Sequence, residues 1–200
     1  MNVIERPRAT ALGAGHVAAA VIAAWVVYAL VGGLDATGQH LLVLGALRIV
    51  LFGALLAFAH AVGAHERRLG RVGLAMAGGC AVLYLVGGIG AVATDGWSFD
   101  VFAGEGDYMP WYAVVIGLSS MLFALGTTLV GVAALSAGKL AVAAILAGLL
   151  FPAVLALQTF GDIVGHIVWL TPWMVLAVGV AAASPDRKIA RSVTVDGRSA

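Results

Sequence analysis

The sequence predicts an all-α, polytopic membrane protein, a bundle of six transmembrane helices with both termini in the cytoplasm. Of its 200 residues, 62% are hydrophobic and 10% are charged, and the mean hydropathy is +1.04. Soluble domains carry about 25% charged residues, and a chain of this size cannot hide so much apolar surface from water. The lipid bilayer is therefore the expected partner, and a membrane-protein partner or a homo-oligomer stays open.

Six apolar runs are each close to the roughly 20 residues that a spanning helix needs. Polar segments separate most runs, and the boundary at Gln158–Asp162 is the weakest. Because the runs fill nearly the whole chain, we expect a single six-helix domain over residues 1–183 and a disordered cytoplasmic tail over 184–200. The runs are residues 11–33, 41–63, 72–93, 112–135, 140–160 and 163–183.

The basic residues predict the orientation of these helices. If the chain crosses the membrane six times, its loop lysines and arginines all fall on one side, and six carboxylates from Asp35 to Asp162 fall on the other. Positive charge stays in the cytoplasm, which predicts a multi-pass protein of the cytoplasmic membrane with both termini inside. The basic residues concerned are Arg6, Arg8, Arg67, Arg68, Arg71, Lys139, Arg187, Lys188, Arg191 and Arg198.

Few residues offer metal or cofactor chemistry. Cys80 is the single cysteine, which excludes an internal disulfide or a cysteine cluster. His16 and His60 lie near the same ends of neighbouring runs, where two histidines could ligate a haem b iron, but nothing else indicates a porphyrin slot. We expect no cofactor and no metal, and the absence of a basic-aromatic patch argues against nucleic acid as a partner.

Arg48 is the outstanding polar residue inside a predicted span. It lies seven residues into the second run, about 10 Å below the outer edge, and ionisable groups at such depth are functional candidates. We expect it to face the interior and to pair with Asp162, either as a structural ion pair or as a binding group. Other polar residues at similar depth could complete a polar layer: Gln158, Ser119, Ser120 and His166.

Proline and tryptophan mark two further features of the later runs. Pro152 and Pro172 should kink the fifth and sixth runs, because proline removes a backbone donor. Four tryptophans lie towards the outer half, where some should anchor at the membrane interface. They are Trp97, Trp111, Trp169 and Trp173.

The segment from Gly117 to Leu125 resembles the nucleophile segment of rhomboid intramembrane serine proteases. Those enzymes carry G-x-S-G on their fourth helix and a histidine on the sixth, in a six-helix core. The resemblance implies Ser119 as the nucleophile and His166 as the general base. The chain departs from the pattern in having Ser120 at the second glycine, and its first loop is much shorter.

Residues 122–135 with the basic turn after them, and the second run leading into Arg67–Arg71, resemble uncharacterised small multi-helix membrane proteins of high-GC bacteria. That resemblance implies no activity. The leading hypothesis is a non-catalytic bundle that acts as a membrane subunit, an interaction partner or a binder of a small or lipidic ligand. The alternatives are a rhomboid-like serine hydrolase and a small-solute or anion pathway.

Overall fold

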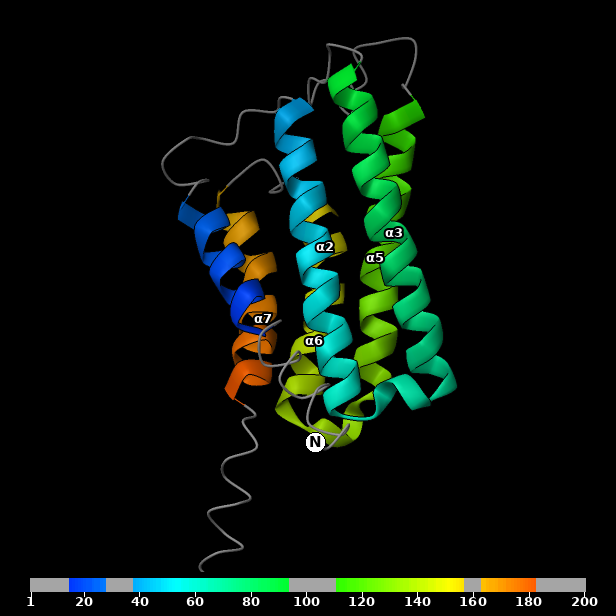
Figure 1. Ribbon diagram of the computed structural model, residues 1–200, viewed down its shortest axis with the longest axis vertical. Helices are drawn as coiled ribbons and strands as arrows, with labels where there is room; N and C mark the ends of the chain where they lie inside the picture. Colours follow the sequence, from blue (N-terminus) through cyan, green and yellow to red (C-terminus); the bar gives the residue numbers. More distant parts are fainter. Residues whose placement is uncertain (1–14, 28–37, 94–110, 157–162, 183–200) are drawn as a thin grey trace, which may run out of the picture.

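The computed structural model describes residues 15–27, 38–93, 111–156 and 163–182, and these residues are entirely helical apart from short turns. They form six helices, of which four are long and apolar enough to span a membrane and two are shorter (Figure 1). In chain order the elements are a first helix Gly15–Val27, α2 Gly38–Ala61, the 3-10 turn η1 Ala64–Glu66, α3 Arg68–Ala93, α5 Trp111–Ala133, the 3-10 turn η2 Leu135–Ala137, α6 Lys139–Ala156 and α7 Ile163–Ala182.

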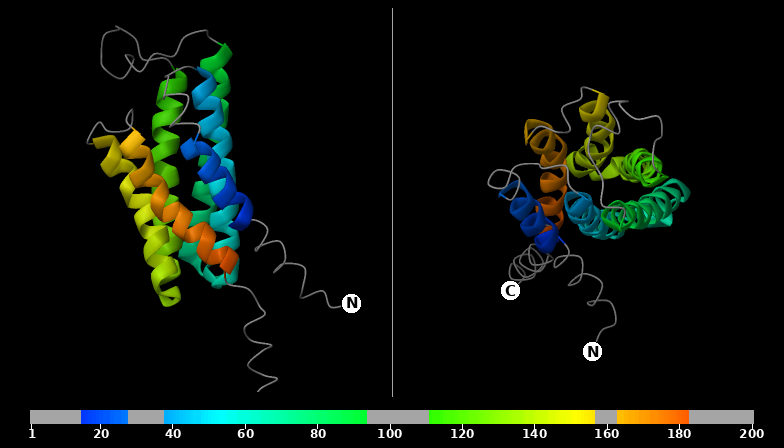
Figure 2. Two further views of the ribbon diagram at one scale, coloured as in Figure 1. Left: turned by 90° about the vertical axis from the view of Figure 1, so that its left-hand side faces the viewer. Right: turned by 90° about the horizontal axis from the view of Figure 1, so that it is seen from above.

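The helices close into a ring around a common interior. Each of α2, α3, α5, α6 and α7 packs on the next, and α7 returns to α2, as the view from above shows (Figure 2). The first helix lies outside α7, and its Gly15 approaches the backbone of Ala177 and Ala181. The side chains that point inward from every helix therefore meet in one core.

Two tight turns connect successive helices at one end of the bundle, η1 between α2 and α3 and η2 between α5 and α6. Gly63 precedes η1 and Gly138 precedes α6, and their φ angles of 70° and 62° fall where glycine is favoured. The Arg67 guanidinium donates a hydrogen bond from Nη1 to the Ala133 carbonyl at 2.6 Å. This bond satisfies an end-of-helix acceptor of α5 and fastens the α2–α3 turn to it.

The helix bounds differ in places from those of the apolar runs. Helix α2 begins at Gly38, three residues before its run, and α3 begins at Arg68, so that Arg71 lies inside the helix. Arginine tolerates this position because its long apolar stem lets the charge reach the membrane surface. The expected tail over 184–200 lies outside the described residues.

Helices α3 and α5 approach each other closely because glycines face each other. A Cβ on Gly73 would lie 2.6 Å from the Gly126 carbonyl oxygen, and one on Gly126 would lie 2.7 Å from the Gly73 oxygen. Neither position has room for a side chain. Small residues at such crossings let two membrane helices gain dispersion contacts along their length.

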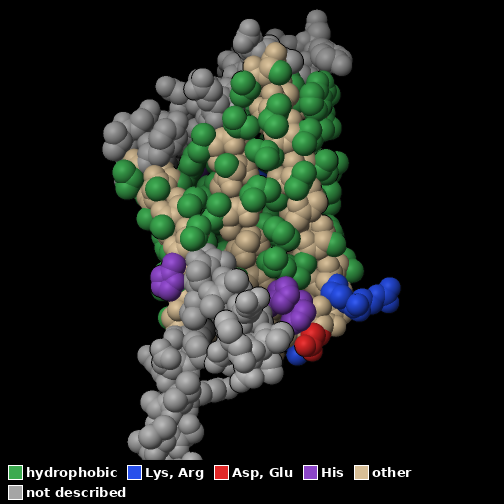
Figure 3. All heavy atoms as spheres, viewed as in Figure 1, with side chains coloured by type: hydrophobic (Ala, Val, Ile, Leu, Met, Phe, Trp, Pro, Cys, Tyr) green, Lys and Arg blue, Asp and Glu red, His purple; other side chains and the backbone are tan. Residues whose placement is uncertain are grey.

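The outside of the ring is apolar, as lipid contact requires. Large hydrophobic side chains are exposed on all six helices, among them Val17, Val43, Leu83, Leu118, Leu149 and Val178. Figure 3 shows this cover along the flanks, with lysine, arginine, glutamate and histidine side chains gathered at one end. The four long helices fit a membrane-spanning bundle, whereas six spans and the cytoplasmic termini stay predictions.

Replacement of Gly126 by alanine should destabilise the protein. The added methyl group would press on the α3 backbone, and overpacking of this kind costs about 1–3 kcal/mol. The matched control is Gly117→Ala on the same helix, where a Cβ meets nothing within 4 Å. Thermal unfolding in detergent should show a lower Tm for Gly126→Ala only, and equal Tm values would contradict the close crossing.

Candidate functional site

The guanidinium of Arg48 lies at the centre of the helix ring. Arg48 is 1% exposed, and its position on α2 is about 15 Å from Gly38 and about 20 Å from Ala61 along the helix. It is thus deeper than the roughly 10 Å expected from the apolar run, because α2 begins earlier. At that depth an arginine has no bulk water to solvate its charge.

Aromatic rings from three other helices surround this guanidinium. Its Cζ atom lies 3.8 Å from the ring centroid of Tyr84 on α3, 5.1 Å from that of Phe151 on α6 and 5.7 Å from that of Phe123 on α5. A cation above a ring face is attracted by the electrons of the ring, by about 2 kcal/mol when desolvated. The rings therefore compensate part of the cost of burying the charge.

The ring contacts do not satisfy the hydrogen-bonding groups of Arg48. Its Nε and Nη1 atoms are buried and have no hydrogen-bond partner among the residues that the structure describes. The N–H bonds of a guanidinium lie in its plane, whereas the Tyr84 ring lies over the carbon at its centre. Burying a charged donor without an acceptor costs free energy, because the donor loses its bonds to water. An acceptor at Nε and Nη1 would recover part of that cost.

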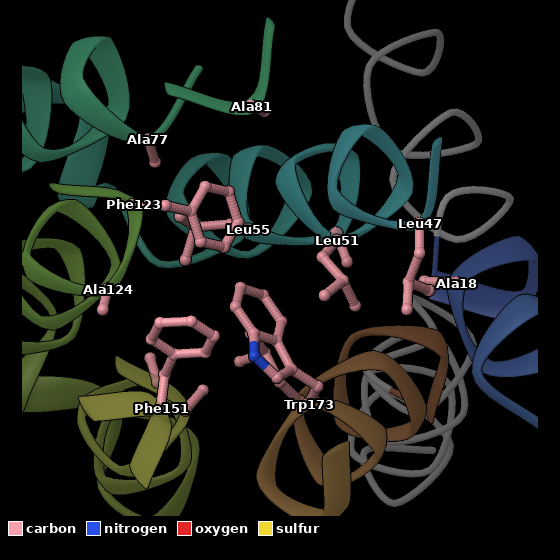
Figure 4. Packing of buried hydrophobic residues seen from close by; sticks show 14 of the residues in the cluster. Ala18, Leu47, Leu51, Leu55, Ala77, Ala81, Phe123, Ala124, Phe151 and Trp173 are labelled. Carbon is pink, nitrogen blue, oxygen red and sulfur yellow. The ribbon is translucent and has the colours of Figure 1, made fainter. Parts of the chain in front are cut away.

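Trp173 on α7 adds a third buried donor. Its side chain is fully buried, and no described residue forms a hydrogen bond with its Nε1. The indole lies 5.8 Å from the Phe123 ring, centroid to centroid. Figure 4 shows Trp173 pointing from α7 into the space between Phe123 and Phe151, the two phenyl rings that also lie near Arg48. The donors of Arg48 and Trp173 therefore share the same aromatic surroundings.

His166 and Trp169 extend this aromatic region along α7. The Trp169 ring is 5.4 Å from Phe151, and the buried His166 ring is 6.1 Å from Trp25 of the first helix. Trp169 and Trp173 are thus core residues and are not among the tryptophans that could anchor at the interface. By contrast, Trp111, the first residue of α5, is 52% exposed.

The serine hydroxyls are occupied by the backbone of their own helix. Ser119 and Ser120 are both buried and both donate to the Ile116 carbonyl, at 3.1 Å and 2.6 Å respectively. Such bonding to the preceding turn is how serine is accommodated inside a membrane helix. Gln158 and Asp162, the other expected members of the polar layer, lie outside the described residues, as does the expected Arg48–Asp162 pair.

His60 in the last turn of α2 and His65 in η1 both bond to carbonyls of α2. The Nδ1 of His60 donates to the Leu56 carbonyl at 2.8 Å, and the Nδ1 of His65 donates to the Ala59 carbonyl at 3.3 Å. The two rings are stacked with centroids 4.2 Å apart. Ala59 is among the last four residues of α2, whose carbonyls lack partners within the helix, so the bond from His65 caps the helix end.

The rings around Arg48 were not found by sequence reasoning. Tyr84, Phe123 and Phe151 occur in separate apolar runs, where a single aromatic residue is ordinary. One signal was present in the spacing of Trp169 and Trp173, since residues four apart share a helix face.

The fold and this site define an all-helical bundle with apolar outer faces and a cationic, aromatic interior. Comparisons with protein-family models, curated proteins and solved structures found no match to the chain. Its function must therefore be argued from the chemistry of the site.

Ser119→Ala should change the free energy of unfolding by no more than about 1 kcal/mol, since the serine makes one ordinary hydrogen bond, to a helix carbonyl. We also expect no labelling of the protein by a fluorophosphonate probe, because the hydroxyl proton is directed to the backbone and not to a base. Ser120→Ala is the matched control. Labelling that is lost in Ser119→Ala and kept in Ser120→Ala would instead establish the serine hydrolase.

Proposed function

We propose that this protein binds a small anion inside the membrane, at a site formed by Arg48 and Trp173. The observation that carries the proposal is a fully buried guanidinium whose Nε and Nη1 have no acceptor in the described part of the chain. Membrane proteins rarely retain an intramembrane charge without a use for it. An apolar residue of similar volume would be easier to bury, because a buried charge must be desolvated.

The donor set selects the chemical class of the ligand. Arg48 supplies positive charge and N–H groups, and Trp173 supplies a neutral N–H. A ligand that accepts hydrogen bonds and carries negative charge satisfies both kinds of group. The phenyl rings of Phe123 and Phe151 close around the guanidinium, which favours a compact anion such as chloride or formate. The protein would thus be a non-catalytic membrane binder.

Binding of a small anion should raise the melting temperature of the purified protein. The reference buffer contains gluconate, which is too bulky for the site, and chloride, formate or acetate replaces it at constant ionic strength. A ligand at 100 times its Kd stabilises by about 2.7 kcal/mol, equivalent to about 5–10 °C for a chain of this size. Arg48→Met should abolish the rise, and Trp173→Phe should reduce it.

Arg48→Met should also have the higher Tm in gluconate, because it removes a buried charge without an acceptor. The control is Arg71→Met, which removes an exposed arginine and should keep the anion response. A response that persists in Arg48→Met would overturn the proposal. So would a response that appears only in Asp162→Asn, since that result would make Asp162 the natural acceptor.

We further propose that the protein crosses the cytoplasmic membrane six times with both termini inside. The support is the distribution of charge: Arg67, Arg68, Arg71 and Lys139 belong to the turn regions at one end of the bundle (Figure 3). Lipid-facing hydrophobic residues on the two shorter helices, such as Val17 and Leu149, support their place in the bilayer.

Cysteine labelling in intact cells tests this topology. Cys80 is buried and would be replaced by alanine, after which a single cysteine is introduced at Trp111 or at Ser136, both of which are exposed. An impermeant maleimide should label Trp111→Cys in intact cells and Ser136→Cys only after permeabilisation. The reverse pattern would contradict the orientation, and labelling of both in intact cells would contradict the spanning of the membrane by α5, which lies between them.

A further inference from the structure

A groove on the outer side of the bundle lies apart from the Arg48 site. It runs between α6 and α7, which pack side by side (Figure 2), and its volume is about 440 Å³. That volume is within the usual range for small-ligand sites. The lining residues are Lys139, Val142, Ala143, Leu146, Leu150, Val168, Thr171, Pro172 and Val175.

The walls of the groove are hydrocarbon. Val142, Leu146 and Leu150 follow one another at four-residue intervals on α6 and so form one ridge. Ala143 and Pro172 are buried between the helices and small enough to leave the hollow. The Thr171 hydroxyl donates to the Ile167 carbonyl at 2.7 Å, so it presents no unsatisfied donor to the groove. These walls fit an alkyl chain.

The length of the groove matches one leaflet of a bilayer. Lys139 and Leu150 are eleven residues apart on α6, which corresponds to about 16 Å along the helix. The hydrocarbon core of a bilayer is about 30 Å thick. A lipid tail lying in this groove would therefore reach from the membrane surface to about the middle of the bilayer.

The Lys139 ammonium lies at the end of the groove where α6 begins. Lys139 is exposed and is the first residue of α6, where the helix dipole adds partial positive charge. Glu66 is the sole carboxylate side chain among the described residues, and it belongs to η1. Lys139 makes no ion pair within the part of the chain that the structure describes. The charge is thus available to a lipid phosphate.

We infer that the α6–α7 groove is a binding site for an anionic phospholipid. One acyl chain lies along Val142, Leu146 and Leu150, and the phosphate lies at the Lys139 ammonium. A zwitterionic lipid with the same chains fills the same groove but carries a second cation close to Lys139, which weakens the contact. The lipid belongs to the leaflet at the basic end of the bundle. This site does not depend on the anion site at Arg48.

Native mass spectrometry of the full chain in mild detergent tests the inference. Phosphatidylglycerol and phosphatidylcholine with identical acyl chains are added in equal amounts. We expect about a fivefold preference for phosphatidylglycerol, the effect of one lysine at a membrane surface. Lys139→Ala should remove the preference and Lys139→Arg should keep it. Arg71→Ala is the matched control, because it removes a cation at the same end but outside the groove.

The contribution of the groove itself is tested on its rim. Val175→Trp places a large side chain at a rim position that is 49% exposed and should lower binding of both lipids. Val178→Trp, at a position 50% exposed on the same helix but outside the lining, should leave binding unchanged. The site would be overturned if the preference for phosphatidylglycerol persisted in Lys139→Ala. It would also be overturned if Arg71→Ala removed the preference equally, since diffuse surface charge would then explain it. If Val175→Trp left lipid binding unchanged, the groove would be excluded as the binding site.

Discussion

The architecture is organised around the burial of one guanidinium. Arg48 lies where no bulk water reaches, so its charge can be stabilised only by what the neighbouring helices supply. Tyr84, Phe151 and Phe123 provide ring faces from α3, α6 and α5, and these contacts tie α2 to three other helices. They leave Nε and Nη1 without acceptors from the helices that the structure describes. An apolar residue of similar volume would cost less to bury than this charge. The presence of arginine here is therefore best explained by a function that needs positive charge.

The close approach of the rings depends on small residues elsewhere in the bundle. Gly73 and Gly126 allow α3 and α5 to cross almost backbone to backbone, which brings Tyr84 and Phe123 to the same cation. Gly148 does the same between α5 and α6, since a Cβ there would meet Thr128 and the Ala124 carbonyl. In a bilayer, where lipid and leucine are equally apolar, such packing supplies much of the attraction between helices.

Arg48 and Lys139 lie in different surroundings. Arg48 is enclosed by protein, so an anion there must give up its water, and the gain from each hydrogen bond is large. Lys139 is exposed at the start of α6, where the attraction of a phosphate would be weak and in competition with salt. The first arrangement suits selection of a small ligand, and the second suits anchoring of the bundle in a leaflet of suitable charge.

The sequence by itself determined the all-helical class and the apolar runs, because a chain this poor in charge can satisfy its backbone in lipid only through helices or a closed barrel. It also singled out Arg48, since an ionisable residue inside an apolar run is conspicuous without any structure. Only the tertiary structure decided which rings meet that arginine, that Trp169 and Trp173 face the core, and that Ser119 donates to Ile116. Those facts depend on the rotation of each helix about its axis and on which helices are neighbours. Both are set by packing between residues far apart in the chain, and no local pattern encodes them.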